Sequence, residues 1–102
     1  MGSWELIDAK IDQNKEEMLK ALQELISIKS VAEETDGPMP FGEGVHKAFT
    51  YLLDKAKEEG FSVENVDNYG GHVELPGRED GVMGIVGHLD VVPEGSGWEE
   101  DP

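Results

Sequence analysis

Apolar residues recur every three or four positions between residues 4 and 28. This spacing gathers them on one face and predicts an amphipathic helix over Trp4–Ile28. The polar tract at 12–17 is a place where this helix could bend or divide, with Asn14 as the cap of a second segment. The same apolar spacing returns farther on and predicts a second helix over Gly44–Glu59, which Gly60 would terminate.

The segment between these helices has a different composition. Residues 36–42 contain two prolines and two glycines, and such a stretch sustains neither a helix nor a central strand. We therefore expect a loop of about a dozen residues. His46 stands beside an apolar position of the second helix, and we expect its side chain to face solvent.

After Gly60 the apolar period changes from that of a helix to that of a strand. Phe61–Val66 and 72–75 alternate apolar and polar residues around a run of turn-forming residues, which predicts a hairpin with His72 facing water. Val82–Gly87 is apolar or glycine at every position, which predicts a central strand buried on both faces. Two helices followed by about three strands indicate part of a layered α/β architecture.

Composition narrows the possible classes of function. Asp and Glu number 23 against 8 Lys and Arg, and the formal net charge of −15 makes nucleic acids and anionic membranes poor partners. The sequence has neither an apolar run long enough to span a bilayer nor a signal peptide, so we expect a cytoplasmic protein. The absence of cysteine leaves histidine and carboxylate side chains as the available metal ligands.

His88 and Asp90 directly follow the apolar segment 82–87. Functional groups of open α/β sheets gather at the carboxyl ends of strands. Residues two apart on an extended chain point to the same side, so Asp90 could orient an imidazole that binds zinc. The alternative is that these polar residues only mark the point where a strand meets water. Trp98, in the polar loop that follows, is expected to be a packing anchor.

Several stretches of the sequence resemble one family of hydrolases. The run Gly-His-Leu-Asp-Val-Val-Pro at 87–93, with Gly97-Trp98 and Asp101-Pro102, resembles the first metal-site motif of the M20 metallopeptidases. Three further segments are similar to the PepV-type dipeptidases of that family: Ile28–Val31, Phe41-Gly42 and Asp67–His72.

This resemblance implies a zinc-dependent dipeptidase or aminopeptidase that hydrolyses short peptides. It implies that His88 is a zinc ligand and that Asp90 is the catalytic-site carboxylate that orients it. It also implies that the complete site binds a second zinc ion. The further acidic ligands, a glutamate general base and a lid domain would all lie beyond residue 102. On this interpretation residues 1–102 are an N-terminal part of the catalytic domain that is inactive alone. Its open sheet edges could cause self-association.

Two other interpretations stay open. A related deacylase or carboxypeptidase of the same family would share the His88 motif, and only the residues around Asn68-Tyr69-Gly70 favour a dipeptidase. A small acidic interaction module without catalysis would also suit the charge and the length of the chain.

Overall fold

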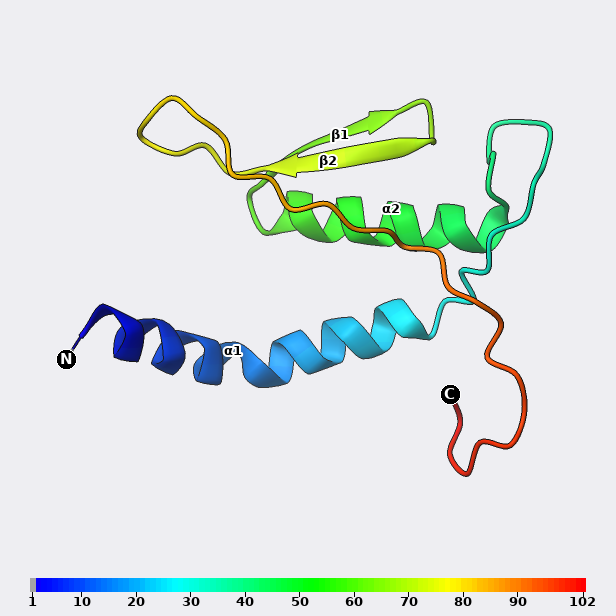
Figure 1. The fold of residues 1–102 in the computed structure, drawn as a ribbon, viewed down its shortest axis with the longest axis horizontal. Helices are drawn as coiled ribbons and strands as arrows, with labels where there is room; N and C mark the ends of the chain where they lie inside the picture. The colour runs from blue at the N-terminus through cyan, green and yellow to red at the C-terminus, as the bar shows by residue number, and fades with distance from the viewer. Residues whose placement is uncertain (1) are drawn as a thin grey trace.

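The structure, a computed structural model, describes residues 2–102 and contains two helices followed by a β-hairpin (Figure 1). The elements, in chain order, are α1 (Ser3–Ile26), α2 (Glu43–Glu58), β1 (Ser62–Val66) and β2 (Gly70–Glu74). The expected α/β class with two helices is therefore confirmed. The radius of gyration is 16.7 Å, whereas a compact domain of this length has about 13 Å. The chain is thus an open arrangement of elements with little interior.

Helix α1 is continuous through the polar tract at 12–17, so the break that this tract suggested does not occur. The first turn is closed by the Glu5 carboxylate, which accepts a hydrogen bond of 3.2 Å from the backbone N–H of Gly2. No residue of α1 is buried, and Trp4 is 80% exposed. The apolar face that the sequence predicts therefore exists, but within the described residues most of it has no covering layer.

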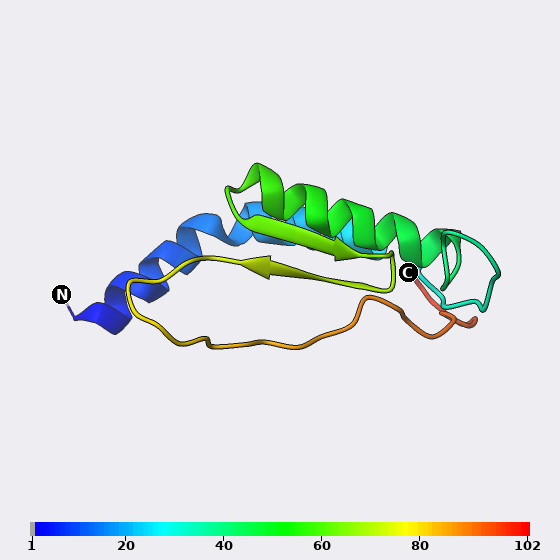
Figure 2. The same ribbon diagram turned by 90° about the horizontal axis from the view of Figure 1, so that it is seen from above.

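Helix α2 carries the small core of the molecule. The hairpin lies along α2, as the two perpendicular views show (Figures 1 and 2). Ala48 on this helix is 1% exposed. A Cβ placed on Gly71 would lie 2.9 Å from Cε1 of Phe49, so the glycine allows the ring to approach the strand closely. The hairpin is thus held by packing against one helix.

Three residues, 67–69, connect the two strands, and a tight turn with Asp67 and Asn68 at its centre reverses the chain. Asp67 and Asn68 have φ angles of 54° and 64°, and the N–H of Tyr69 donates to the carbonyl of Val66 at 3.0 Å. Positive φ at both central residues matches the right-handed twist of the two strands, and Asn and Asp tolerate it well. The register pairs Val63 with Val73 and places the hairpin where the sequence predicts it.

The predicted third strand, Val82–Gly87, does not form in the described part of the chain. The segment runs as an extended ribbon apart from the hairpin (Figure 2), with Ile85 90% and Val86 98% exposed. A strand buried on both faces needs neighbouring strands and a layer above and below it. Here β1 and β2 pair with each other in a two-stranded sheet, and residues 2–102 provide no further layer. The expectation of burial was wrong for this chain.

We predict that this exposed apolar segment makes the chain self-associate. An extended, uncharged stretch with unpaired backbone groups is a template for pairing with another copy. The net charge of −15 opposes association through repulsion between copies. Salt weakens this repulsion, because at 1 M the Debye length is about 3 Å and charges farther apart than that are largely screened. Light scattering should therefore show larger particles as salt concentration rises, and Ile85→Asp/Val86→Asp should prevent the growth.

A matched control separates the loss of the apolar segment from the added charge. Gln13→Asp/Gln23→Asp adds the same two charges at exposed positions of α1 and should leave the salt-dependent growth in place. Equal suppression by both double variants would show that net charge alone, and not the segment, governs association.

Within residues 2–102, neither α1 nor α2 combines the length and the hydropathy needed to cross a bilayer.

Candidate metal-binding site

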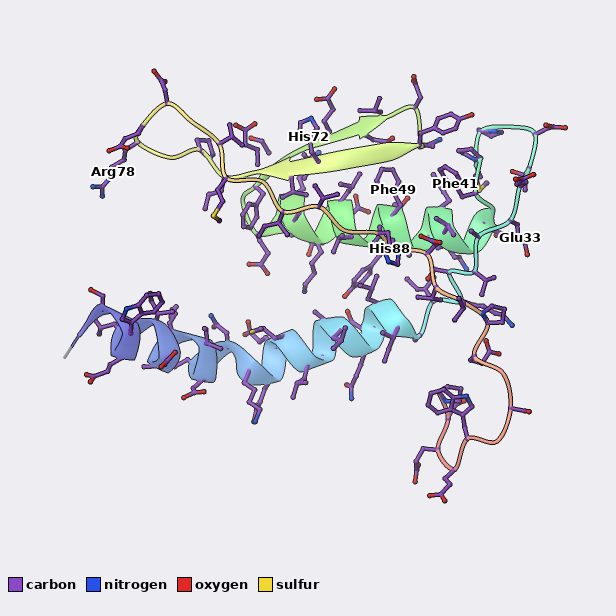
Figure 3. All side chains as sticks on the ribbon, viewed as in Figure 1. Glu33, Phe41, Phe49, His72, Arg78 and His88 are labelled. Carbon is purple, nitrogen blue, oxygen red and sulfur yellow. The ribbon has the colours of Figure 1, made fainter. Side chains whose placement is uncertain are left out.

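His88 lies on the extended segment that follows the hairpin (Figure 3). Its side chain is 81% exposed and that of Asp90 is 52% exposed. The pair therefore stands at the surface of the described chain, and the apolar residues before it do not enclose it. The structure does bring the two predicted residues into contact.

The contact between the two residues determines which ring nitrogen carries the proton in the neutral imidazole. Nδ1 of His88 lies 2.9 Å from the backbone carbonyl oxygen of Asp90 and 3.2 Å from its carboxylate Oδ1. Both of these atoms are acceptors, so Nδ1 carries the proton and donates to them. In the neutral ring Nε2 then has an unshared electron pair, which is the form of imidazole that binds a metal ion.

The stretch around Asp90 is tied to the connection between α1 and α2. Val31 and Val91 form an isolated parallel β-bridge, and the N–H of Val91 donates to the carbonyl of Ser30 at 3.0 Å. Segments about 60 residues apart in the sequence are therefore held side by side. Two stretches that carry the resemblance to dipeptidases, 28–31 and 87–93, meet at this bridge.

Two further stretches of that resemblance also meet. The side-chain N–H of Asn68 donates to the carbonyl of Pro38 at 2.7 Å. The rings of Phe41 and Tyr69 pack edge to face with their centroids 5.6 Å apart. The hairpin turn and the end of the loop at 27–42 are thus joined, a contact that sequence spacing does not predict.

Lys29 and Glu94 add an ion pair beyond the bridge, with Nζ 3.4 Å from Oε1. Trp98 remains 60% exposed and donates its indole N–H to the carbonyl of Glu94 at 2.8 Å. Trp98 therefore holds this loop through a hydrogen bond. A packing anchor would have a buried ring, so that expectation was wrong.

The pKa of Glu94 is lowered by a hydrogen bond from its own backbone N–H and by the charge of Lys29. Because the pKa is lowered, this contact is intact above the ordinary value of 4.5 and is lost only as pH falls through the lowered pKa. We predict that the Glu94 carboxyl titrates below 4.5 in a ¹³C NMR titration. Lys29→Met should move the midpoint only part of the way back, since the backbone hydrogen bond is the larger cause, and Lys10→Met should leave it unchanged. A midpoint at or above 4.5 would contradict the geometry.

The other two histidines do not join His88. His72 is exposed as expected, and its Nε2 lies 2.8 Å from a carboxylate oxygen of Glu64 on the paired strand. His46, which we expected in solvent, is half-buried, and its Nδ1 is buried without a hydrogen-bond partner in the described chain. The start of α2 packs tightly on the preceding connection, because a Cβ on Gly44 would lie 1.9 Å from the carbonyl oxygen of Lys29.

The residues present fit one part of a zinc site and not a whole one. No three His, Asp or Glu side chains among residues 2–102 are grouped so that they could hold a metal ion. A catalytic zinc ion has three protein ligands, and here His88 supplies a single donor atom with Asp90 to orient it. Residues 2–102 therefore do not form a catalytic zinc site by themselves.

Comparison with known proteins points to dipeptidases. The chain is 42% identical over 102 residues to "Putative dipeptidase YtjP" of Bacillus subtilis and 45% identical over 100 residues to "Beta-Ala-Xaa dipeptidase" of Lactobacillus delbrueckii subsp. lactis. A protein named as a putative dipeptidase in Staphylococcus haemolyticus is 36% identical over 95 residues. No protein-family model matches the chain.

These similarities cover nearly all of this chain but a small part of each relative. They extend over 98%, 96% and 91% of the chain and over 21%, 20% and 20% of the three relatives. The chain therefore spans about a fifth of the length of the dipeptidases that it resembles.

Proposed function

We propose that this chain supplies one metal ligand and its orienting carboxylate to a zinc-dependent dipeptidase. The observation that carries the proposal is the contact of His88 Nδ1 with both acceptors of Asp90, which directs the unshared pair to Nε2. Similarity to named dipeptidases over nearly the whole chain supports the substrate class, a short peptide. Both side chains are exposed, so ligands from other residues could reach a metal ion bound to His88.

Each part of the proposed site has its own chemical task. A zinc ion held partly by His88 would supply Lewis-acid chemistry for hydrolysis of a peptide bond. His88 provides a neutral nitrogen donor, and Asp90 keeps the ring in the tautomer and orientation that presents Nε2. The remaining ligands and the general base would come from residues outside this chain.

A chimera tests this proposal most sharply. In it, the present chain replaces the matching 100 residues of the Lactobacillus delbrueckii relative. We expect the chimera to hydrolyse a β-Ala-Xaa dipeptide, to lose activity with a chelator and to regain it with zinc. We expect the 102-residue chain alone to show no turnover with added zinc.

Two results would count against the proposal. One is a folded chimera whose hydrolysis is insensitive to chelation. The other is zinc-dependent turnover by the chain alone that disappears in His88→Ala, because the chain would then hold a complete site.

A further inference from the structure

Ser30 stands out as a buried polar side chain in a molecule with little interior. It is 4% exposed, and it lies in the connection between α1 and α2. The first turn of α2 covers it, since a Cβ on Gly44 would lie 3.6 Å from the Cα of Ser30. A buried hydroxyl needs a hydrogen-bond partner, and this one finds it 59 residues away in sequence.

Ser30 is bonded to both peptide groups that flank Asp90. Its Oγ–H donates to the carbonyl of Leu89 at 3.0 Å, on the N-terminal side of Asp90. Its own carbonyl accepts from the N–H of Val91 at 3.0 Å, on the C-terminal side. Two fixed peptide planes leave the backbone of Asp90 little freedom to rotate.

The second of these peptide groups is the one that His88 contacts. The peptide unit between Asp90 and Val91 accepts from His88 Nδ1 through its carbonyl at 2.9 Å and donates to Ser30 through its N–H. Two hydrogen bonds that share one peptide group polarise each other, so the bond from the Val91 N–H to the backbone carbonyl of Ser30 makes the Asp90 carbonyl a stronger acceptor for the imidazole.

We propose that Ser30 is a positioning residue that fixes the tautomer and direction of His88 by holding the backbone on both sides of Asp90. This inference rests on the proposed function for its catalytic meaning, because the direction of Nε2 matters to hydrolysis only if that atom binds metal. Ser30 is not a nucleophile here: its hydroxyl is buried and its proton is given to a carbonyl oxygen.

The arrangement also differs from ordinary packing. A serine that served only to fill space could be replaced by a residue of similar volume without effect on the imidazole. Only the bond to the Leu89 carbonyl depends on the serine hydroxyl, since the bond from the Val91 N–H is accepted by the backbone carbonyl of residue 30. Loss of the hydroxyl frees the peptide group on the N-terminal side of Asp90, and this change should be detected at His88 itself.

The test uses the 102-residue chain, labelled with ¹⁵N and kept at about pH 8, where an ordinary imidazole is neutral. In the wild type, the ¹⁵N shifts of His88 should show a protonated Nδ1 and an unprotonated Nε2. Ser30→Ala removes the hydroxyl donor to the Leu89 carbonyl and keeps the backbone carbonyl that accepts from Val91. It should shift the ring toward a mixture of both tautomers and speed hydrogen exchange at the Val91 amide roughly fivefold, because the bridge that holds this amide then has one hydrogen bond in place of two. Ser30→Cys, which keeps the volume but donates weakly, should act in the same direction.

Ser27→Ala is the matched control. Ser27 also donates its hydroxyl to a backbone carbonyl, that of Glu24 at 2.7 Å, but it is exposed at the end of α1. It should leave the His88 shifts and the Val91 exchange rate unchanged. Circular dichroism of each variant, together with the cysteine variant, guards against an alanine variant that fails to fold.

The outcomes separate this inference from the proposed function. Unchanged His88 shifts and unchanged Val91 exchange in folded Ser30→Ala and Ser30→Cys would overturn the positioning role, even if the chimera proves to be a zinc-dependent dipeptidase. Altered shifts in the Ser30 variants would support the role, even if the chimera shows no dependence on zinc.

Discussion

Replacing His88 with alanine in the chimera is expected to reduce kcat/KM for dipeptide hydrolysis by more than about 100-fold and to lower the bound zinc. Removing an outer partner of a metal ligand typically costs about 10- to 100-fold, and removing the ligand itself should cost more. Asp90→Ala should lie at the lower end of that range, because the backbone carbonyl of residue 90 still accepts from Nδ1 at 2.9 Å.

His72→Ala is the control for this substitution. His72 is also an exposed histidine, but it contacts Glu64 on the hairpin and lies outside the proposed site. Its loss should leave activity and zinc content within about twofold of the starting chimera, well below the loss expected at His88. Equal losses for the His88 and His72 variants would indicate a general defect of folding and would count against the assignment of His88.

Gly44→Ala is expected to destabilise the chain, although helix propensity alone predicts the opposite. Alanine in place of glycine within a helix gains about 0.5–1 kcal/mol. However, the new Cβ would lie 1.9 Å from the carbonyl oxygen of Lys29, a backbone atom that cannot move without displacing Ser30. Overpacking of this kind costs about 1–3 kcal/mol, so the clash outweighs the gain in propensity.

Urea unfolding followed by circular dichroism measures this effect. The midpoint for Gly44→Ala should fall below that of the wild type. Gly77→Ala is the control, because a Cβ at Gly77 would have no atom within 4 Å and its φ is not positive. A midpoint for Gly44→Ala at or above the wild-type value would show that Lys29 and the start of α2 are not packed as the structure places them.

Elements that depend on local interactions were predictable from the sequence. The apolar period of 3.6 residues locates both helices within two residues of their observed ends, and alternation with Asp67-Asn68 between the strands locates the hairpin. Gly60 has φ of 95° directly after the C-cap of α2, as a helix-terminating glycine should.

Whether Val82–Gly87 forms a buried strand depends on the elements around it, and local sequence does not predict them. The apolar pattern indicates which residues are suited to burial on two faces, but it does not provide the neighbours that bury them. Within the described residues the exposed apolar face of α1 and this exposed segment reflect the same physical fact, namely that the layers needed to cover them are absent there.

The candidate site also has one part that local spacing predicts and one part that it does not. Contact between His88 and Asp90 follows from a separation of two residues on an extended chain, so the sequence was sufficient to place them together. Ser30 was outside that prediction, because nothing in local spacing links it to a carbonyl 59 residues away. Its only sequence signal was membership of the stretch 28–31, which we used for the resemblance to dipeptidases and not for any chemical role.

The most direct measurement is anomalous diffraction at the zinc edge from crystals of the zinc-loaded chimera. The proposal predicts a peak about 2.0–2.1 Å from Nε2 of His88, with Nδ1 directed at Asp90. A zinc peak whose ligands exclude His88, or one that lies on Nδ1 with Asp90 turned away, would contradict it.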